Sequence, residues 1–363
     1  MPIKFKPFLQ GKSTYKGGKS LAEVAGINKK IHKLSSNENQ LGASPKALAA
    51  IKRHIDSLFR YPDNSDERLR TALEKFYNGA LKADQFLTTN SGVANIDLIV
   101  RAFMSEGDEC IFSNPAFGPY HEFPKKIGAS SIDIPLIGDD FLLDVEGIVN
   151  AVTEKTRLIF ITSPNNPTGT HIPKYQVDEL VEKLPDHVIL VFDEVYFQFV
   201  DAPDYVRPLP YVLEGKNVIG INSLSKAYGL AGLRVGYSYS TPEIATYLRQ
   251  LRIPFMINTI SMEGALAALE DNEFIEQTVK SIHEEKEFLY KQYDELGIKY
   301  WKTQANFILT QPDMDPKEFE DKMLQEGIMV RPVAGFGAPK CVRITIGTRE
   351  ANEALIEAWK KIL

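Results

Sequence analysis

Lys226 lies in the stretch of the chain whose residue types and spacing best suit covalent chemistry. Ser223 and Ser225 precede it, Arg234 follows eight positions later, and an apolar run at 218–221 comes before the whole segment. Most lysines are ordinary solvated charges, but an amine can bond to a carbonyl carbon, while hydroxyl and guanidinium groups bind anions. The arrangement therefore predicts a Schiff-base lysine beside a phosphate.

Other polar residues follow apolar runs of the kind that form buried strands. The runs 158–162 and 188–192 are continuously apolar, and 174–183 between them has the period of a helix. Strands that alternate with helices imply a parallel sheet, whose ligands bind at the carboxyl ends of the strands. The residues expected at that edge are 88–92, Asn166, Asp193, Tyr196 and 223–226.

The segment 86–104 has the order strand, turn, helix. Its turn, Asn90-Ser91-Gly92-Val93-Ala94, consists of small residues. Such a turn exposes backbone N–H groups at the start of a helix, where anions bind, although many α/β proteins have one for packing alone. The segment is therefore a candidate phosphate site.

The apolar run 188–192, followed by two acidic residues, could also be the strand end of a nucleotide triphosphatase. That class needs a P-loop, with a glycine five positions before its Gly-Lys pair and a strand ahead of it. The two Gly-Lys-Ser segments, 11–13 and 18–20, have Lys6 and Ser13 in the glycine position. Neither segment is a P-loop.

The Lys226 stretch resembles the cofactor-lysine signature of fold-type I pyridoxal-phosphate aminotransferases, in particular the histidinol-phosphate aminotransferase group. The resemblance runs from about Tyr15 to Ile362. Its other markers follow in family order: Tyr15-Lys16-Gly17-Gly18, Asn37-Glu38-Asn39, Tyr61-Pro62, the turn at 90–94, Phe117, Asn165-Asn166-Pro167-Thr168-Gly169 and Asp193. The chain departs from the group at Gly17 and Gln40, where the group has prolines, and at 91–94, where it usually has Gly-Ser-Asp-Glu.

The resemblance implies a pyridoxal 5'-phosphate enzyme and a role for each matching residue. Lys226 would form the Schiff base and carry the proton, and Asp193 would pair with the pyridine nitrogen. Asn166 and Tyr196 would donate hydrogen bonds to the phenolic oxygen of the ring, on which Phe117 would stack. The implied phosphate ligands are Ser91, Gly92, Val93, Ser223, Ser225, Arg234 and, from a second subunit, Tyr61.

Two arginines are the implied anchors for the substrate. Arg343 interrupts an alternating apolar strand and resembles the arginine that binds the substrate carboxylate, a ligand that suits its planar fork. Arg331 resembles the arginine associated with the substrate's phosphate in the histidinol-phosphate group. Tyr15 and Asn39 are the further substrate residues implied, and no residue is assigned to a metal.

The implied activity is transamination of histidinol phosphate with 2-oxoglutarate, in histidine biosynthesis. Two alternatives use the same machinery: transamination of an aromatic amino acid, and a lyase reaction such as decarboxylation of a phosphorylated amino acid. A non-catalytic binding protein is disfavoured, because the lysine and its partners are all present. The expected partners are a small-molecule amino donor, a 2-oxo acid acceptor and a second copy of the chain, in a homodimer with shared sites.

The composition of the 363-residue chain is that of an ordinary globular protein, with 44% hydrophobic and 25% charged residues. Its net charge of -6 argues against nucleic acid as a partner. The first residues lack an apolar signal segment, and no stretch approaches the roughly 20 apolar residues that cross a bilayer, so a cytoplasmic location without a membrane is expected. Cys110 and Cys341 lie in apolar runs and are expected to be buried free thiols.

The expected fold is α/β, with a mostly parallel central sheet flanked by helices and a second, smaller α+β domain. An N-terminal arm would cover 1–33, a large cofactor-binding domain 34–255, and a small C-terminal domain 256–363. Ser44 as cap and Pro45 at the first helical position predict a helix over 46–58. The later elements expected are helices within 241–297, including the periodic run 260–296, strands at 306–310, 328–331 and 341–347, and a final helix at 348–362.

Overall fold

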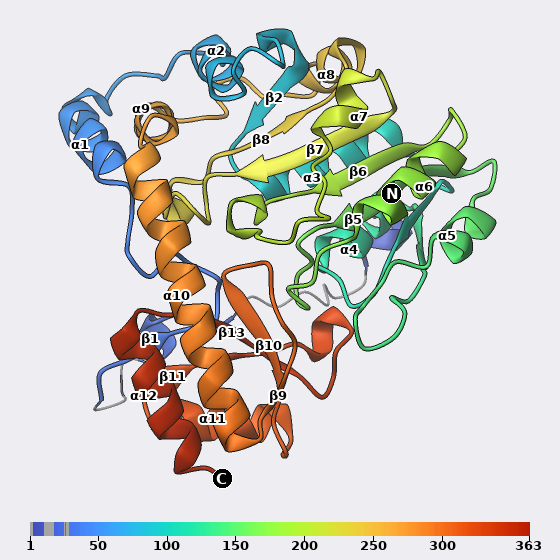
Figure 1. The fold of residues 1–363 in the computed structure, drawn as a ribbon. Helices are drawn as coiled ribbons and strands as arrows, with labels where there is room; N and C mark the ends of the chain where they lie inside the picture. The colour runs from blue at the N-terminus through green and yellow to red at the C-terminus, as the bar shows by residue number, and fades with distance from the viewer. Residues whose placement is uncertain (1–2, 11–17, 25, 27–28) are drawn as a thin grey trace.

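A seven-stranded sheet forms the centre of the larger part of the molecule in the computed structural model, which describes residues 3–10, 18–24, 26 and 29–363 (Figure 1). Strand β8 is antiparallel to both of its neighbours, and every other neighbouring pair is parallel. The prediction of a mostly parallel sheet is therefore confirmed. In spatial order the strands are β2 (Phe86–Thr89), β8 (Gly236–Tyr239), β7 (Val218–Ser223), β6 (Ile189–Asp193), β5 (Thr156–Thr162), β3 (Glu109–Phe112) and β4 (Ser130–Asp133).

Helices cover both faces of this sheet, which explains why its central strands are apolar throughout. On one face the helices pack around Val191 and Ile219, and they are α3 (Gly92–Phe103), α4 (Pro119–Lys125) and α8 (Pro242–Arg249). On the other face they pack around Leu190 and Phe192, and they are α2 (Glu67–Phe76), α5 (Val145–Ala151), α6 (Lys174–Lys183), α7 (Leu209–Leu213) and α9 (Thr259–Leu269). Because side chains alternate along a strand, consecutive residues of β6 serve opposite faces.

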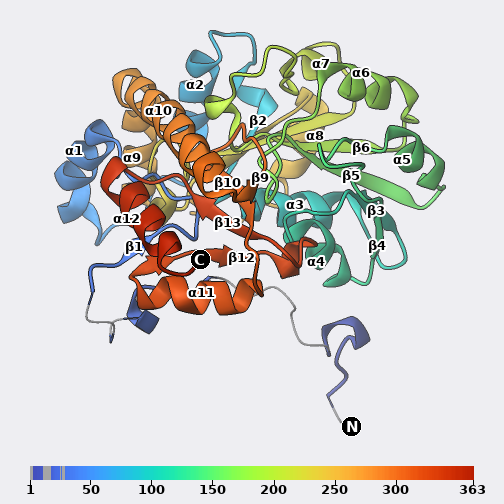
Figure 2. The same cartoon turned by 60° about the horizontal axis from the view of Figure 1, so that its bottom comes forward.

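A second, smaller layer is built from the C-terminal third of the chain, drawn in orange and red in Figures 1 and 2. Its antiparallel sheet has the order β12 (Arg331–Pro332), β13 (Val342–Thr345), β10 (Phe307–Gln311) and β9 (Lys299–Tyr300). The helices beside it are α10 (Asn272–Leu296), α11 (Pro316–Gln325) and α12 (Arg349–Lys360), with a core that includes Phe319 and Trp359. This confirms the expected α+β part, while the division at residues 33 and 255 stays a prediction.

The helix predicted from Ser44 and Pro45 is present as α1 (Pro45–His54), with the Ser44 hydroxyl accepting a hydrogen bond from the N–H of Ala47. It ends earlier than expected, in a 3₁₀ turn at Ile55–Ser57. The periodic run 260–296 is two helices, α9 and α10. Asp271, the N-cap residue of α10, lies between them and accepts a hydrogen bond from the Ser44 hydroxyl at 2.6 Å.

The predicted strand 328–331 is divided between two sheets. Its first part, β11 (Ile328–Met329), pairs in parallel with β1 (His32–Lys33), whereas β12 pairs with β13. Cys110 and Cys341 are buried free thiols, as predicted. Among the residues that the structure describes, no helix combines the length and apolar character needed to span a bilayer.

Candidate active site

A cavity of about 300 Å³ lies where the carboxyl ends of β5, β6 and β7 face the C-terminal layer. Thr162, Asp193 and Ser223, the last residues of these three strands, all contribute to its wall. The structure therefore brings most of the predicted site residues together at one place. The predicted residues that line the cavity are Gly92, Val93, Phe117, Asn166, Asp193, Tyr196, Ser223, Ser225, Lys226, Arg234, Arg331 and Arg343.

Lys226 lies in this cavity, just beyond the end of β7. Its Nζ donates a hydrogen bond to the backbone oxygen of Ser36 at 3.1 Å. Burial lowers the pKa of Lys226 to about 7, and the positive charge of Arg343 adds to that effect while Glu38 opposes it. An amine with this pKa is present as both ammonium and free base near neutral pH, so it can take up and release protons.

Asp193 is the acid at the end of β6. Its Oδ2 accepts a hydrogen bond from the Tyr120 hydroxyl at 2.8 Å, and its Oδ1 accepts one from the N–H of Val195 at 3.1 Å. Burial raises the pKa of this carboxyl to about 6, and the two hydrogen bonds act in the opposite direction. The Tyr120 hydroxyl in turn accepts a hydrogen bond from Thr162 at 2.8 Å, so the carboxylate ends a short chain of polar groups.

The end of the cavity predicted to hold phosphate is formed by the start of α3 and the segment after β7. Ser91 is the N-cap of α3, and its hydroxyl accepts a hydrogen bond from the N–H of Ala94. Gly236 allows β8 to lie against the start of α3, because a side chain at Gly236 would lie 2.3 Å from the Gly92 nitrogen. A Cβ added at Gly92 would lie 3.5 Å from the Cβ of Ser223, which ends β7, so the start of α3 lies close to this strand end. Backbone N–H groups at a helix start, together with hydroxyl groups, form a suitable anion site.

Arg234 brings a positive charge to the same end. Its backbone is left-handed, with φ 56°, and its Nη1 donates to the Ala231 oxygen at 2.9 Å. The side chain is exposed along part of its length while also lining the cavity. The guanidinium is therefore accessible to an anion entering from solvent.

Two arginines lie at the opposite end, which the C-terminal layer contributes. Arg343 donates from Nη1 to Asn166 Oδ1 at 2.5 Å and from Nη2 to the Ser35 oxygen at 2.9 Å. Arg331 lies with its guanidinium 5.7 Å from the centre of the Phe336 ring. The pair gives this end a positive potential that suits an anionic group on a substrate.

Phe117 lines the cavity, and two other aromatic rings lie against its own. Its ring meets that of Tyr120 edge-on, with centroids 5.8 Å apart, and lies nearly parallel to Phe336 at 6.5 Å. This arrangement fixes the plane of the Phe117 ring, as a stacking partner for a planar ligand requires.

The segment 37–39 contributes to the cavity differently from its predicted role. Asn39 does not line the cavity, because its amide nitrogen donates to the Ala227 oxygen at 2.9 Å and to the Thr278 hydroxyl at 3.1 Å. Asn37 and Glu38 line it instead, and the Asn37 amide donates to the Tyr196 hydroxyl at 2.9 Å.

Tyr120, Asn37 and Glu38 are among the cavity residues that sequence reasoning missed. Tyr120 follows the expected stacking residue Phe117 by three positions, which is the one local signal that could have drawn attention to it. Asn37 has a left-handed backbone, with φ 55°, and is almost fully buried. Asparagine tolerates that conformation better than most residues.

Like Asn39, the predicted residues Ser91 and Tyr61 do not line the cavity of this single chain. Tyr61 is 85% exposed and stacks on Phe255, with ring centroids 5.0 Å apart. Tyr15 lies outside the described residues. Neither tyrosine position tests its predicted role.

Comparison with known proteins places this geometry in context. The family model for aminotransferase class I and II matches residues 29–358. A histidinol-phosphate aminotransferase of Akkermansia muciniphila is 39% identical over 96% of this chain and 96% of its own length. Histidinol-phosphate aminotransferase 1 of Mannheimia succiniciproducens is 38% identical over 98% of this chain and 96% of its own.

A solved structure has the same fold. The histidinol-phosphate aminotransferase of Sinorhizobium meliloti, in complex with pyridoxal-5'-phosphate, matches with a TM-score of 0.89 and 24% identity. The match covers 99% of this chain and 98% of that chain. The seven-stranded sheet and the C-terminal layer are thus arranged as in that structure.

Proposed function

The chain belongs to the family of class I and II aminotransferases, and from this premise we propose that it transfers the amino group of histidinol phosphate to 2-oxoglutarate, with pyridoxal 5'-phosphate as cofactor. The observation that carries the choice of substrate is the identity of 38% and 39% to relatives named histidinol-phosphate aminotransferases, over nearly the full length of both chains. The two arginines at one end of the cavity support it, because the proposed donor carries a phosphate and the acceptor carries carboxylates.

The residues of the cavity fit the cofactor by their chemistry. A buried carboxyl, Asp193, suits a protonated pyridine nitrogen, and the flat Phe117 ring suits the face of an aromatic ring. The start of α3, Ser223, Ser225 and Arg234 suit a phosphate. When bound, pyridoxal phosphate supplies an electron sink that makes a proton on the amine-bearing carbon of the substrate removable.

Lys226 would hold the cofactor covalently through Nζ and, once displaced by the substrate amine, would move the proton. Its pKa of about 7 suits both tasks, because the free base accepts the proton from the substrate carbon and the ammonium then returns it. Asp193 would keep the pyridine nitrogen protonated. The hydrogen bond from Tyr120 favours the charged form of that carboxyl, which burial alone disfavours.

Asn166 and Tyr196 would orient the ring from its oxygen-bearing edge. The Oδ1 of Asn166 accepts from Arg343, which directs its amide nitrogen to act as the donor. The Tyr196 hydroxyl oxygen accepts a hydrogen bond from the Asn37 amide, so the hydroxyl proton of Tyr196 must be donated in another direction. Both polar side chains are held by residues that lie far away in the sequence.

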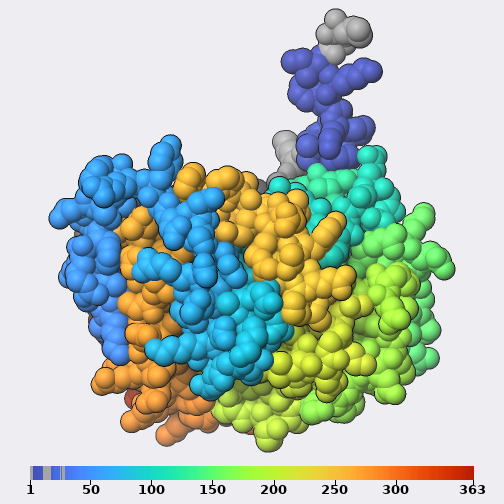
Figure 3. All heavy atoms as spheres, turned by 90° about the horizontal axis from the view of Figure 1, so that it is seen from above, coloured from blue at the N-terminus to red at the C-terminus, as the bar shows by residue number. Residues whose placement is uncertain are grey.

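The working unit that we propose is a homodimer with shared active sites. Tyr61 lies on a surface with several exposed apolar side chains, and it would reach the cofactor phosphate of the other subunit. The exposed apolar residues near Tyr61 in sequence are Ile55, Leu58 and Phe59, and its ring stacks on that of Phe255, which is also exposed, as are Leu251 and Ile253. Residues 3–10 extend from the rest of the molecule in Figures 2 and 3, as an N-terminal arm that packs on a second subunit would.

A titration of the purified enzyme tests the substrate. Histidinol phosphate, phenylalanine and threonine phosphate are added separately to the protein loaded with pyridoxal phosphate, and the absorbance of the bound cofactor is followed. Histidinol phosphate should deplete that absorbance at the lowest concentration, and 2-oxoglutarate should restore it. A preference for phenylalanine would contradict the proposal, as would turnover without any oxo acid, which is the behaviour of a lyase.

A further inference from the structure

Glu194 is the neighbour of Asp193 in sequence, but it serves the opposite face of the sheet. Asp193 lines the cavity, whereas the Glu194 carboxylate lies with the tyrosines of β8 and with Arg207, on the face that carries α6 and α7. The Glu194 side chain is fully buried. Burying a charged carboxylate costs free energy unless the group is paired and hydrogen-bonded, so the role of Glu194 outside the cavity must be explained by its partners.

Three elements converge on this carboxylate. Arg207 binds it with both prongs of its guanidinium, from Nε to Oε2 and from Nη2 to Oε1, each at 2.7 Å. The Tyr239 hydroxyl of β8 donates to Oε1 at 2.8 Å, and the Asn222 amide of β7 donates to the same oxygen at 3.4 Å. The ends of β6, β7 and β8 are therefore joined through one side chain.

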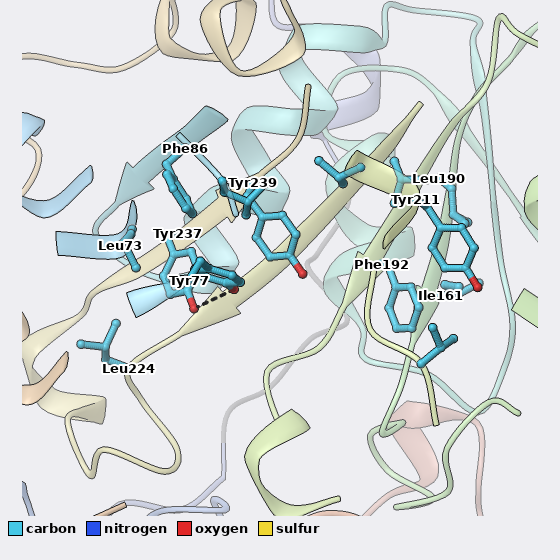
Figure 4. Packing of buried hydrophobic residues seen from close by; sticks show 14 of the residues in the cluster. Leu73, Tyr77, Phe86, Ile161, Leu190, Phe192, Tyr211, Leu224, Tyr237 and Tyr239 are labelled. Atoms are coloured by element: carbon cyan, nitrogen blue, oxygen red, sulfur yellow. Dashed lines mark hydrogen bonds between the residues drawn. The ribbon is translucent and has the colours of Figure 1, made fainter. Parts of the chain in front are cut away.

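The surroundings of the ion pair are aromatic. The Arg207 guanidinium lies 3.7 Å from the centre of the Phe197 ring and donates to the Tyr77 hydroxyl at 3.0 Å. Figure 4 shows the Tyr77 and Tyr237 hydroxyls meeting, 3.3 Å apart, with the Tyr239 ring beside them. The Glu194 carboxylate is thus fully buried beside aromatic rings, while the Arg207 side chain is 26% exposed.

Gly220 makes the contact from β8 possible. It is paired with Tyr239, whose side chain must cross β7 to reach Glu194, the residue that follows β6. A side chain at Gly220 would lie 2.5 Å from the Tyr239 ring. The absence of a side chain at this strand position, where glycine weakens a strand, therefore serves the hydrogen bond to Glu194.

The ion pair is connected to both ends of the cavity. On one side, Glu194 follows Asp193 directly. On the other, the Asn222 oxygen accepts from the N–H of Ser223 at 2.8 Å, and the Ser223 hydroxyl accepts from the N–H of Ser225 at 3.3 Å. Replacing a buried ion pair by apolar residues is often neutral for stability, so stability alone does not account for this one.

We propose that Glu194 and Arg207 are positioning residues that set the distance between Asp193 and the Ser223–Ser225 segment, so that one ligand can engage both at once. The ligand is the pyridine and phosphate of the same cofactor, so this inference rests on the proposed function. Neither residue touches the ligand. Loss of the ion pair should weaken the simultaneous binding of both ends more than the binding of either end alone.

The test compares ligands that engage one end or both. Apoprotein is titrated with pyridoxal phosphate, with pyridoxal and with inorganic phosphate, in the wild type and in Glu194→Gln, which keeps the shape of the side chain. The variant should bind pyridoxal phosphate about tenfold or more weakly, while its Kd values for pyridoxal and phosphate stay within about twofold. Equal weakening for all three ligands, or no weakening for any, would overturn the proposal.

The matched control is Glu285→Gln. Glu285 on α10 is also a buried carboxylate, bound by Arg349 and by the Asn352 amide of α12, but it lies outside the cavity wall. This variant should lower the Tm and leave all three Kd values unchanged. If it weakens pyridoxal phosphate as much as Glu194→Gln does, the effect is general destabilisation and the inference is wrong.

Two outcomes keep this inference separate from the proposed function. If wild-type apoprotein does not bind pyridoxal phosphate, the proposed function fails, and with it the ligand on which the inference rests. If Glu194→Gln does not fold, Tyr239→Phe removes a single hydrogen bond to the same carboxylate and keeps the ring. It should weaken pyridoxal phosphate several-fold, again without an equal effect on phosphate, and wild-type affinity would overturn the inference.

Discussion

The Tyr120 hydroxyl of α4 donates a hydrogen bond to Oδ2 of Asp193, the last residue of β6, across 2.8 Å. The same hydroxyl accepts from Thr162 at 2.8 Å, so its proton is committed to the carboxylate. This contact stabilises the charged form of Asp193 against the effect of burial, which raises the pKa of that group to about 6.

Tyr120→Phe should therefore raise the pKa of Asp193 and reduce activity near neutral pH. A hydrogen bond to a charged group contributes about 1.5–3 kcal/mol, so we expect the acid limb of the pH profile of kcat/KM to move upward by about one to two units. The measurement is that profile, together with the pH titration of the absorbance of the bound cofactor.

Tyr293→Phe is the matched control for this change. Tyr293 is fully buried in the C-terminal layer, and its hydroxyl has no hydrogen-bond partner among the described residues. Its loss should leave the pH profile in place. If both variants behave alike, the Tyr120 hydroxyl does not act on Asp193.

The predictions from sequence were most accurate where the signal was local. The period of 174–183 predicted α6 with its observed bounds, and the small residues around Ser91 predicted the helix start that faces Ser223. Lys226, Asp193 and Asn166 were brought together because parallel strands end at a common edge. No long-range contact was needed for these inferences.

The remaining features depend on contacts between distant segments. Tyr120 and Asp193 are 73 positions apart, and neither residue carries a local sign of the other. In the sequence, Glu194 is simply the second of two consecutive acidic residues, although its side chain serves the face of the sheet opposite to that of Asp193. Strand 328–331 was predicted as one element because the period of a strand does not show where its pairing partner changes from β1 to β13.

The low pKa of Lys226 gives a prediction for the protein without its cofactor. The free base reacts with acetic anhydride and the ammonium does not, so acetylation of Lys226 in apoprotein should rise with pH and level off above a midpoint of about 7. Peptide mapping by mass spectrometry measures the rate at this residue. A midpoint close to that of an ordinary lysine would show that the cavity does not lower the pKa.

The variant Arg343→Met tests the direction in which the Arg343 charge shifts the pKa of Lys226. Burial lowers the Lys226 pKa most, and the Arg343 charge lowers it further, since a nearby cation disfavours a second one. Removal of that cation should move the acetylation midpoint to higher pH. A midpoint that stays in place or falls would show that the Arg343 charge does not lower the Lys226 pKa and that burial alone does.

Asp193→Asn should separate activity from stability. The amide cannot form the charge-assisted hydrogen bond that favours a protonated pyridine nitrogen, so we expect kcat to fall by two or more orders of magnitude. The variant should fold normally. Wild-type kcat in this variant would reduce Asp193 to an ordinary acid at a strand end.

The same variant has a defined effect on the pH dependence of unfolding. The Asp193 pKa is about 6 in the folded apoprotein and 3.8 ordinarily, so the folded state binds more protons between these values and loses stability as pH rises. From pH 5 to pH 8 the wild type should lose about 1 kcal/mol relative to Asp193→Asn. Urea unfolding of both apoproteins at the two pH values measures this difference, and parallel curves would contradict the raised pKa.

Tyr61 is 85% exposed on the surface of a single chain. If it completes the site of the other subunit, mixing Tyr61→Ala with Lys226→Ala and allowing the subunits to exchange should restore activity. In a mixed dimer, the site with an intact Lys226 receives its Tyr61 from the Lys226→Ala subunit, while the other site carries both defects. Random exchange would then give about a quarter of the wild-type activity per subunit.

The arrangement of defects makes this result specific. If Tyr61 served its own subunit, each site of the mixed dimer would keep one defect and no activity would return. The assay is run at limiting pyridoxal phosphate, because loss of a phosphate ligand affects cofactor binding first, and mass spectrometry of intact dimers confirms that exchange has occurred. Tyr61→Phe is the control, since it keeps the ring that stacks on Phe255 and removes only the hydroxyl. If Tyr61→Phe is as defective as Tyr61→Ala and both are complemented, the hydroxyl is the group that crosses the interface.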